Sequence, residues 1–175
     1  MTKKQELLNA AEHKVRSGGY SNFSFRELAK EVGIKSASVH YHFPTKADLG
    51  AEVARQYTDN FIRLLGDPIE LKKSGEDPIK VYVAQFRRAL FEDEKMCLCG
   101  LLGAETDCLP DKVKEETKRF FKLNLNWLQV AHKLNDPTDF EQKAANTLSL
   151  LEGAMMVSKA VGDNNFFEQA TNWLV

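Results

Sequence analysis

The sequence predicts an all-α protein of about nine helices, and three observations lead to this fold class. Hydrophobic residues recur every three or four positions along most of the 175 residues, which is the spacing of amphipathic helices. No convincing run of alternating residues predicts a strand. The hydrophobic fraction of 43% is ordinary for a soluble globular protein, and there is neither a signal-peptide core nor an apolar run long enough to cross a membrane. We therefore expect a helical protein of the cytoplasm.

Three short helices are expected at the start of the chain. The first covers about residues 7–15 and ends at a glycine pair. The second begins at Ser24, which forms a capping box with Glu27. Gly33 follows it at a tight turn that needs a residue free to adopt positive φ. The third helix then runs from about residue 36 to 42, so two helices are joined by a short glycine turn.

The remaining helices, of which the one after Cys97 is short, are predicted from the same periodicity. They are expected over about residues 46–64, 79–90, 97–106, 113–131, 139–161 and 164 to the end, with a loop around residues 72–75. The helix that begins near Lys46 leaves the first part of the chain and enters the second. We therefore divide the sequence into a head, residues 1–48, and a body, residues 49–175.

Charge is distributed unevenly between these two parts. Residues 1–50 contain eight Lys and Arg against five Asp and Glu, whereas the remainder contains 16 basic and 20 acidic residues. Three of the four histidines also lie in the first part. A basic head on an acidic body suggests that the head has a polyanionic partner, although an excess of this size can also arise by chance.

The third helix of the head has an outer face that suits contact with DNA. Val39 and Phe43 are one turn apart and should face the core, together with Ile34. The outward residues are then polar but almost uncharged, and nearly all of them can donate a hydrogen bond. They are Lys35, Ser36, Ser38, His40, Tyr41 and His42. This arrangement is a helix-turn-helix, in which the last helix lies in the major groove of double-stranded DNA.

Two stretches of the head carry a resemblance to a known family. FRELAKEVGI, from Phe25 to Ile34, and SVHYHFPTKADL, from Ser38 to Leu49, resemble the DNA-binding signature of the TetR/AcrR family of bacterial transcriptional regulators. The similarity covers about residues 5–50. It implies a homodimer, a body that binds a small-molecule inducer of unknown identity, and repression that is relieved when this ligand binds.

The resemblance also implies which residues of the head contact DNA. Arg26 is the candidate for guanine readout, because Arg can bridge O6 and N7; an ion pair with Glu27 or Glu31 is the alternative. His40 stands where the family usually has tyrosine, so affinity for DNA could weaken above about pH 6.5, unless His40 is simply a neutral surface residue. The complete set of predicted DNA-binding residues is Ser24, Phe25, Arg26, Lys35, Ser36, Ala37, Ser38, His40, Tyr41, His42 and Lys46.

The body places a few polar groups on otherwise apolar and aromatic helix faces. This mixture is typical of small-molecule pockets, and also of ordinary cores. The predicted ligand-binding residues are Tyr57, Phe61, Tyr82, Phe86, Cys97, Phe120, Phe121, Asn124 and Trp127.

The last two helices are apolar on more than one face, which indicates burial on more than one side. Two such helices from each of two chains would form a four-helix dimer interface, and the twofold axis would supply two recognition helices. The predicted interface residues are Leu148, Leu151, Met155, Phe166, Phe167 and Trp173. The alternative is an internal core helix followed by a loose aromatic tail.

The three cysteines, Cys97, Cys99 and Cys108, have an odd count and no zinc-ligand spacing, so we expect neither structural disulfides nor a metal. Some relatives sense electrophiles through cysteine, while the alternative is that these are small buried hydrophobic residues. The sequence has no glycine-rich phosphate loop, metalloprotease motif or nucleophile elbow, so neither an enzyme nor a cofactor is expected. The competing function is a helical small-molecule-binding protein, or a cysteine-based redox sensor, without operator-specific DNA binding.

Overall fold

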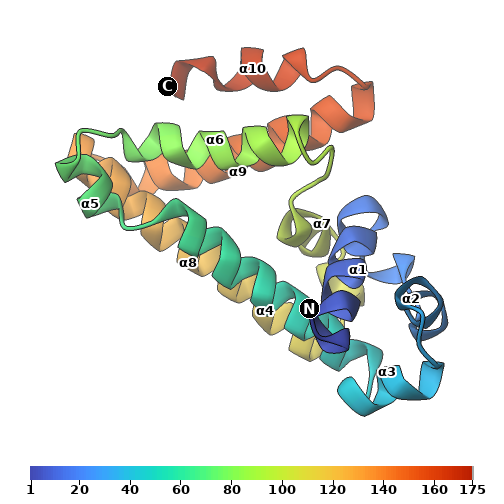
Figure 1. Ribbon diagram of the computed structural model, residues 1–175. Coiled ribbons are helices and arrows are strands. Elements are labelled where there is room, and N and C mark those ends of the chain that lie inside the picture. Colours follow the sequence, from blue (N-terminus) through green and yellow to red (C-terminus); the bar gives the residue numbers. More distant parts are fainter. Residues whose placement is uncertain (175) are drawn as a thin grey trace. The chain divides into compact units, whose positions relative to one another are not determined.

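The computed structural model describes residues 1–174; residue 175, the last of the predicted body, lies outside them. The all-α fold class is confirmed, because every regular element in the described residues is helical. The α-helices (Figure 1) are α1 (Lys3–Gly18), α2 (Phe25–Val32), α3 (Ser36–His42), α4 (Lys46–Leu65), α5 (Pro68–Lys73), α6 (Pro78–Phe91), α7 (Leu98–Ala104), α8 (Asp111–Asn135), α9 (Phe140–Val161) and α10 (Asn165–Thr171). Short 3₁₀ helices cover Tyr20–Asn22 (η1), Thr106–Cys108 (η2) and Asn172–Leu174 (η3).

The described chain forms two compact units. The N-terminal unit consists of Met1–Asn60 and Leu98–Phe120, and the C-terminal unit consists of Phe61–Cys97 and the chain from Phe121 onward. Helices α4 and α8 therefore contribute a segment to each unit. The predicted head lies within the N-terminal unit, which also contains α7 and the start of α8. The functional division at residue 48 remains a prediction.

Local hydrogen bonds explain where the head helices begin. The Ser24 hydroxyl accepts from the backbone N–H of Glu27 at 3.3 Å and donates to the Glu27 carboxylate at 2.8 Å. The expected Ser24 cap is therefore present, although Glu27 accepts from the hydroxyl rather than from a backbone N–H. At the start of α4, the Asp48 carboxylate accepts from the N–H of Thr45, and the Asp48 N–H donates to the Thr45 hydroxyl. This second reciprocal cap fixes the start of α4, a few residues after the recognition helix α3 ends.

Helix α5 is the element that the hydrophobic periodicity did not predict. Its N-cap is Asp67, whose carboxylate accepts from the backbone N–H groups of Ile69 and Glu70, and Pro68 occupies the first turn. Proline is favoured there because its missing N–H and fixed φ suit the start of a helix. The Asp-Pro pair therefore starts α5, two residues after α4 ends at Leu65.

Each unit has a core of its own. In the N-terminal unit, α1 packs against α2 and α7, and α2 packs against α3. The buried side chains there include Leu7, Val15, Leu28, Val39 and Phe43. In the C-terminal unit, α9 packs against α6 and α10, around buried side chains that include Tyr82, Phe86, Leu151, Met155 and Phe167. None of the helices within residues 1–174 is long and apolar enough to span a membrane.

Candidate DNA-binding surface and ligand site

The turn between α2 and α3 has helix-turn-helix geometry. Gly33 ends α2 in the left-handed conformation, with φ 71° and ψ 39°, and the backbone N–H of Ile34 donates to the carbonyl of Ala29. This backbone conformation favours glycine because it has no Cβ to clash. Val39 is fully buried and Phe43 is 3% exposed, so these two residues anchor α3 from the inside. The inward side of α3 is therefore the one that the sequence predicted.

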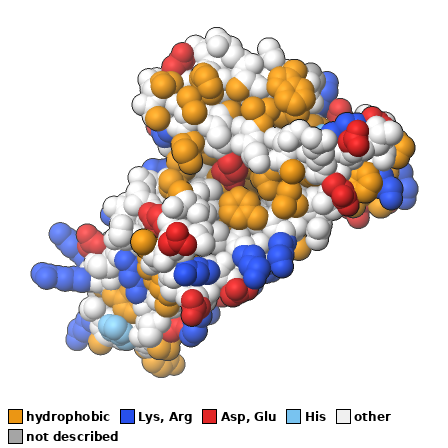
Figure 2. All heavy atoms as spheres, turned by 180° about the vertical axis from the view of Figure 1, so that it is seen from behind, with side chains coloured by type: hydrophobic (Ala, Val, Ile, Leu, Met, Phe, Trp, Pro, Cys, Tyr) orange, Lys and Arg blue, Asp and Glu red, His pale blue; other side chains and the backbone are white. Residues whose placement is uncertain are grey.

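The other side of α3 is open to solvent. Tyr41 is 86% exposed, an unusual value for a large aromatic residue, and Ser38 and His42 are half-buried. Lys35, Ser36, Ala37 and His40 are exposed as well. Several Lys and Arg side chains and one histidine patch lie toward the lower left of Figure 2, over the head. This face presents ammonium, hydroxyl and imidazole groups that can reach phosphates and base edges.

Arg26 is exposed at the start of α2. The two acids considered as its ion-pair partners have other contacts. The Glu27 carboxylate accepts from the Ser24 hydroxyl, and the Glu31 carboxylate lies 3.7 Å from the Lys14 ammonium. These contacts favour the prediction that the Arg26 guanidinium faces a partner outside the chain.

Lys46 has an intramolecular environment that the sequence did not reveal. Its ammonium lies 4.8 Å from the ring centroid of Tyr20 and 4.4 Å from that of Phe23, and the side chain is half-buried. Burial lowers the pKa of Lys46, while the nearby carboxylates of Glu27 and Glu105 oppose this effect. Cation–π contacts thus provide an explanation for Lys46 that needs no phosphate. Its predicted contact with DNA remains a prediction.

His40 and Phe25 support each other across the two helices. The imidazole lies edge-to-face with the Phe25 ring at 4.8 Å, and its Nδ1 lies 3.3 Å from the carbonyl oxygen of Pro44. Phe25 is half-buried. His40 therefore has a structural role in addition to its predicted contact with DNA, and the pH dependence remains untested.

Glu105 joins the end of α7 to the turn between α1 and α2 within the N-terminal unit. Its carboxylate accepts from the backbone N–H of Tyr20 at 2.9 Å. Gly19 is buried with φ 78°, and a Cβ added there would lie 1.8 Å from a Glu105 oxygen. The absence of a side chain at residue 19 thus makes room for Glu105. Sequence reasoning missed Glu105 because 85 residues separate it from Tyr20.

The predicted ligand-binding residues fall into both units. Tyr57 and Phe120 lie in the N-terminal unit, with ring centroids 5.8 Å apart. Around Tyr82 in the C-terminal unit, ring centroids lie at 5.4 Å for Trp127, 5.6 Å for Phe86 and 5.9 Å for Phe61. Cys97, Phe121 and Asn124 also belong to the C-terminal unit. The ligand-binding role of this set remains a prediction.

Polar groups in the C-terminal unit are arranged around Tyr82, which is fully buried. Its hydroxyl donates to the side-chain oxygen of Asn124 at 2.7 Å. Burial raises the pKa of Tyr82 well above its usual value, and the negative charge of Glu152 raises it further. Glu152, on α9, was not among the predicted residues. Its position between Leu151 and a small, apolar stretch is the signal that could have identified it.

The cysteines divide by accessibility. Cys97 and Cys99 are buried and Cys108 is exposed, and none of the three forms a disulfide. The interpretation as small buried residues therefore suits Cys97 and Cys99, while only Cys108 is open to a reagent in this structure. Within residues 1–174, no group of three or more His, Cys, Asp and Glu side chains is placed to hold a metal ion.

The predicted dimer-interface residues differ in how exposed they are in the single chain. Leu148, Leu151, Met155 and Phe167 are at most 5% exposed in the single chain, so they pack inside the C-terminal unit and have little area to offer a partner. Phe166 and Trp173 are exposed, as an interface requires. The exposed hydrophobic residues that the prediction missed are Met156, Val157 and Val161, on α9. Hydrophobic side chains also gather at the top of Figure 2, the part that contains α10.

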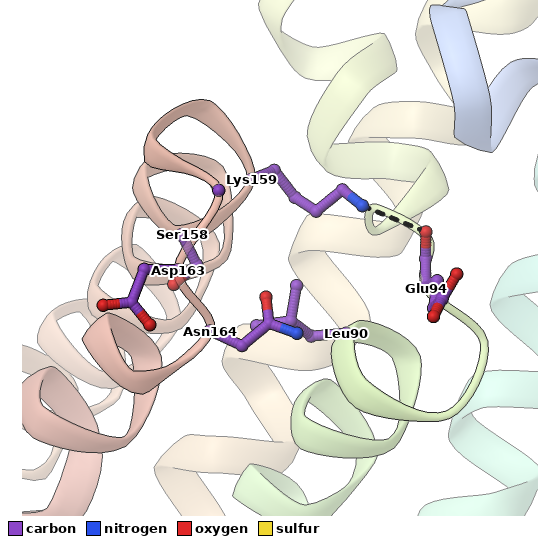
Figure 3. A pocket seen from close by; sticks show the side chains of 7 residues that line it. Leu90, Glu94, Ser158, Lys159, Asp163 and Asn164 are labelled. Carbon is purple, nitrogen blue, oxygen red and sulfur yellow. Dashed lines mark hydrogen bonds between the residues drawn. The ribbon is translucent and has the colours of Figure 1, made fainter.

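A surface pocket of about 280 Å³ opens where α9 meets α10 (Figure 3). It is lined mainly by polar residues, and the Lys159 ammonium donates to the backbone carbonyl of Glu94 at 3.2 Å. Asp163 and Asn164 complete the side nearest α10. This pocket contains none of the predicted ligand-binding residues, so it does not correspond to the predicted aromatic site.

The fold and the exposed recognition helix define the class of helix-turn-helix transcriptional regulators, and comparisons agree. The sequence model of "Bacterial regulatory proteins, tetR family" matches residues 7–53. A TetR transcriptional regulator from Legionella pneumophila is 31% identical, with a TM-score of 0.91 over 99% of this chain and 96% of that one. The chain belongs to the TetR family. It is a DNA-binding regulator, not an enzyme.

Two further relatives agree with this assignment. A TetR-family regulator from Agrobacterium tumefaciens is 25% identical, with a TM-score of 0.83 over 97% of this chain and 94% of that one. The HTH-type transcriptional regulator LmrA of Bacillus subtilis (strain 168) is 23% identical over 87% of this chain and 81% of its own length. Regulators of this family bind operator DNA and ligands and act as dimers.

Proposed function

We propose that this protein is a homodimeric repressor that leaves its operator when a small molecule binds to the C-terminal unit. The observation that carries the proposal is the exposed, donor-rich face of α3, set beside exposed Arg26. A repressor must be in the same compartment as its operator DNA, so we place this protein in the cytoplasm. Burial of Cys97 and Cys99 favours a noncovalent inducer; an electrophile as inducer depends on Cys108.

Replacing Arg26 by alanine should weaken operator binding by about 1–3 kcal/mol, or roughly 5- to 150-fold, because a bidentate contact with guanine is lost. Specificity should relax at one base pair in each half-site. Lys35→Ala should instead weaken binding to all sequences about equally and reduce the salt dependence. Fluorescence anisotropy with labelled DNA from upstream of the gene, titrated at several salt concentrations, measures both effects.

The matched control is Lys80→Ala, which removes an exposed cation from α6 in the C-terminal unit. It should leave operator affinity unchanged. If Arg26→Ala binds the operator as tightly as Lys80→Ala does, the predicted readout by Arg26 is wrong. If the unaltered protein forms no salt-sensitive complex with any upstream DNA, the proposed function itself is wrong.

Val157→Asp should turn the dimer into a monomer. Val157 lies on α9 and is 39% exposed in the single chain, among the exposed hydrophobic residues described above. A carboxylate introduced twice near a twofold axis would be desolvated and would face its copy. Sedimentation-velocity or light-scattering measurements give the mass directly. Ala145→Asp adds the same charge at an exposed position about three turns earlier on α9, on a face rotated by about a third of a turn, and should remain dimeric. Dimers in both variants would contradict this interface.

A further inference from the structure

The carboxylate of Glu152 is buried and unpaired within the C-terminal unit. Both of its oxygens are inaccessible to solvent, and neither has a hydrogen-bond partner among the described residues. Desolvation raises the pKa of this carboxyl to about 7, and the Cys97 thiol, a weak donor that approaches the carboxylate without good hydrogen-bond geometry, lowers it only in part. Buried polar groups are paired in the great majority of cases, so an exception requires an explanation. The simplest explanation is a ligand that pairs with Glu152 and is not supplied by the chain itself.

The surroundings of Glu152 indicate what kind of partner is missing. The Tyr82 hydroxyl is close enough to Glu152 for the charge of Glu152 to raise its pKa, but this hydroxyl donates to Asn124 at 2.7 Å. No Lys, Arg or His is among the groups that shift the pKa of Glu152. Beyond Tyr82 lie the rings of Phe61, Phe86 and Trp127. The cluster thus offers one negative charge and several aromatic rings, but no positive charge.

That combination suits an organic cation. A carboxylate attracts a positive charge most strongly in a site with little water, and aromatic faces attract ammonium groups as well. An anionic ligand would be repelled by Glu152. A neutral ligand without an N–H or O–H would leave the carboxylate unpaired, and a neutral donor would add a hydrogen bond but no attraction between opposite charges.

We propose that Glu152 recognises the cationic group of the inducer, so that the inducer is a small organic ammonium compound with an apolar or aromatic body. This inference rests on the proposed function, because it assumes that the C-terminal unit binds an inducer. It adds the charge of that ligand and names the residue that selects it. A cation from a second protomer fits the observations less well, because the two oxygens are already buried in the single chain.

Calorimetric titration of the full-length protein with two probes tests this assignment. Benzyltrimethylammonium carries the cation, and neopentylbenzene is its uncharged carbon isostere. We expect the unaltered protein to bind the cation at least tenfold more tightly than the isostere. Glu152→Gln should abolish this preference without weakening binding of the neutral probe. Glu141→Gln removes an exposed carboxylate from the same helix and should behave like the unaltered protein.

Three results would overturn the assignment: no binding of the cation at millimolar concentration, equal binding of the two probes, or an unchanged preference in Glu152→Gln. Operator binding is measured separately, without any probe. Loss of operator binding in the unaltered protein would refute the proposed repressor and leave the calorimetric result standing. Retention of operator binding, with no selectivity for the cation, would refute the role of Glu152 alone.

Discussion

Gly19→Ala should destabilise the protein by about 3 kcal/mol or more. Gly19 has φ 78° and ψ −173°, a backbone region that is almost exclusive to glycine and costs other residues about 1–3 kcal/mol. The new Cβ would also occupy the position of a Glu105 oxygen, only 1.8 Å away. Displacing Glu105 loses its hydrogen bond from Tyr20, and a bond to a charged group contributes about 1.5–3 kcal/mol. Urea-induced unfolding followed by circular dichroism measures the loss.

Two controls separate the clash from the backbone cost. Gly33 also has positive φ, at 71°, but an added Cβ there would meet no atom within 4 Å, so Gly33→Ala should cost only about 1 kcal/mol. In a Glu105→Ala background, Gly19→Ala should lose its additional cost, and the double-mutant cycle gives the coupling between residues 19 and 105. Equal costs at Gly19 and Gly33 would show that Glu105 is not constrained by residue 19.

The head could be predicted well because its information is local. The Ser24 cap and the turn at Gly33 depend on residues three to five positions apart. Val39 and Phe43 alone identify the inward face of α3. Helix α5 was missed for a related reason. Its six residues are too few to show a hydrophobic period, and its start depends on Asp67 and Pro68.

The surfaces of the C-terminal unit could not be predicted in the same way. Periodicity identified α9 as apolar on more than one side, but could not tell which side packs against α6 and α10. Met155 and Val157 look alike in sequence, yet one is fully buried and the other is 39% exposed. Likewise, the rings around Lys46 and the cluster around Glu152 come from distant parts of the chain. Such contacts leave no regular spacing in the sequence.

Glu152→Gln should change the pH dependence of stability between pH 5 and pH 8, because the carboxyl of Glu152 titrates within this range in the folded protein. The pKa of Glu152 is about 7 in the folded protein against an ordinary value of 4.5, so folding favours the protonated form. Its contribution is fully present below about pH 4.5 and is lost as pH rises through 7, a loss of about 3 kcal/mol. Glutamine cannot ionise and avoids this loss. Tyr82, with its raised pKa, stays protonated over this range.

We therefore expect the two proteins to have similar unfolding free energies at pH 5, and Glu152→Gln to be the more stable by about 3 kcal/mol at pH 8. Urea titrations at both pH values measure this difference, and Glu141→Gln should show no such divergence. If the two proteins differed in unfolding free energy by the same amount at pH 5 and at pH 8, the Glu152 carboxyl would not be buried in solution. A residue that lowers the stability of the free protein at neutral pH fits a binding site better than a structural role. A bound cation would hold Glu152 ionised and offset the loss, and this is the kind of exchange of stability for function that is found in binding sites.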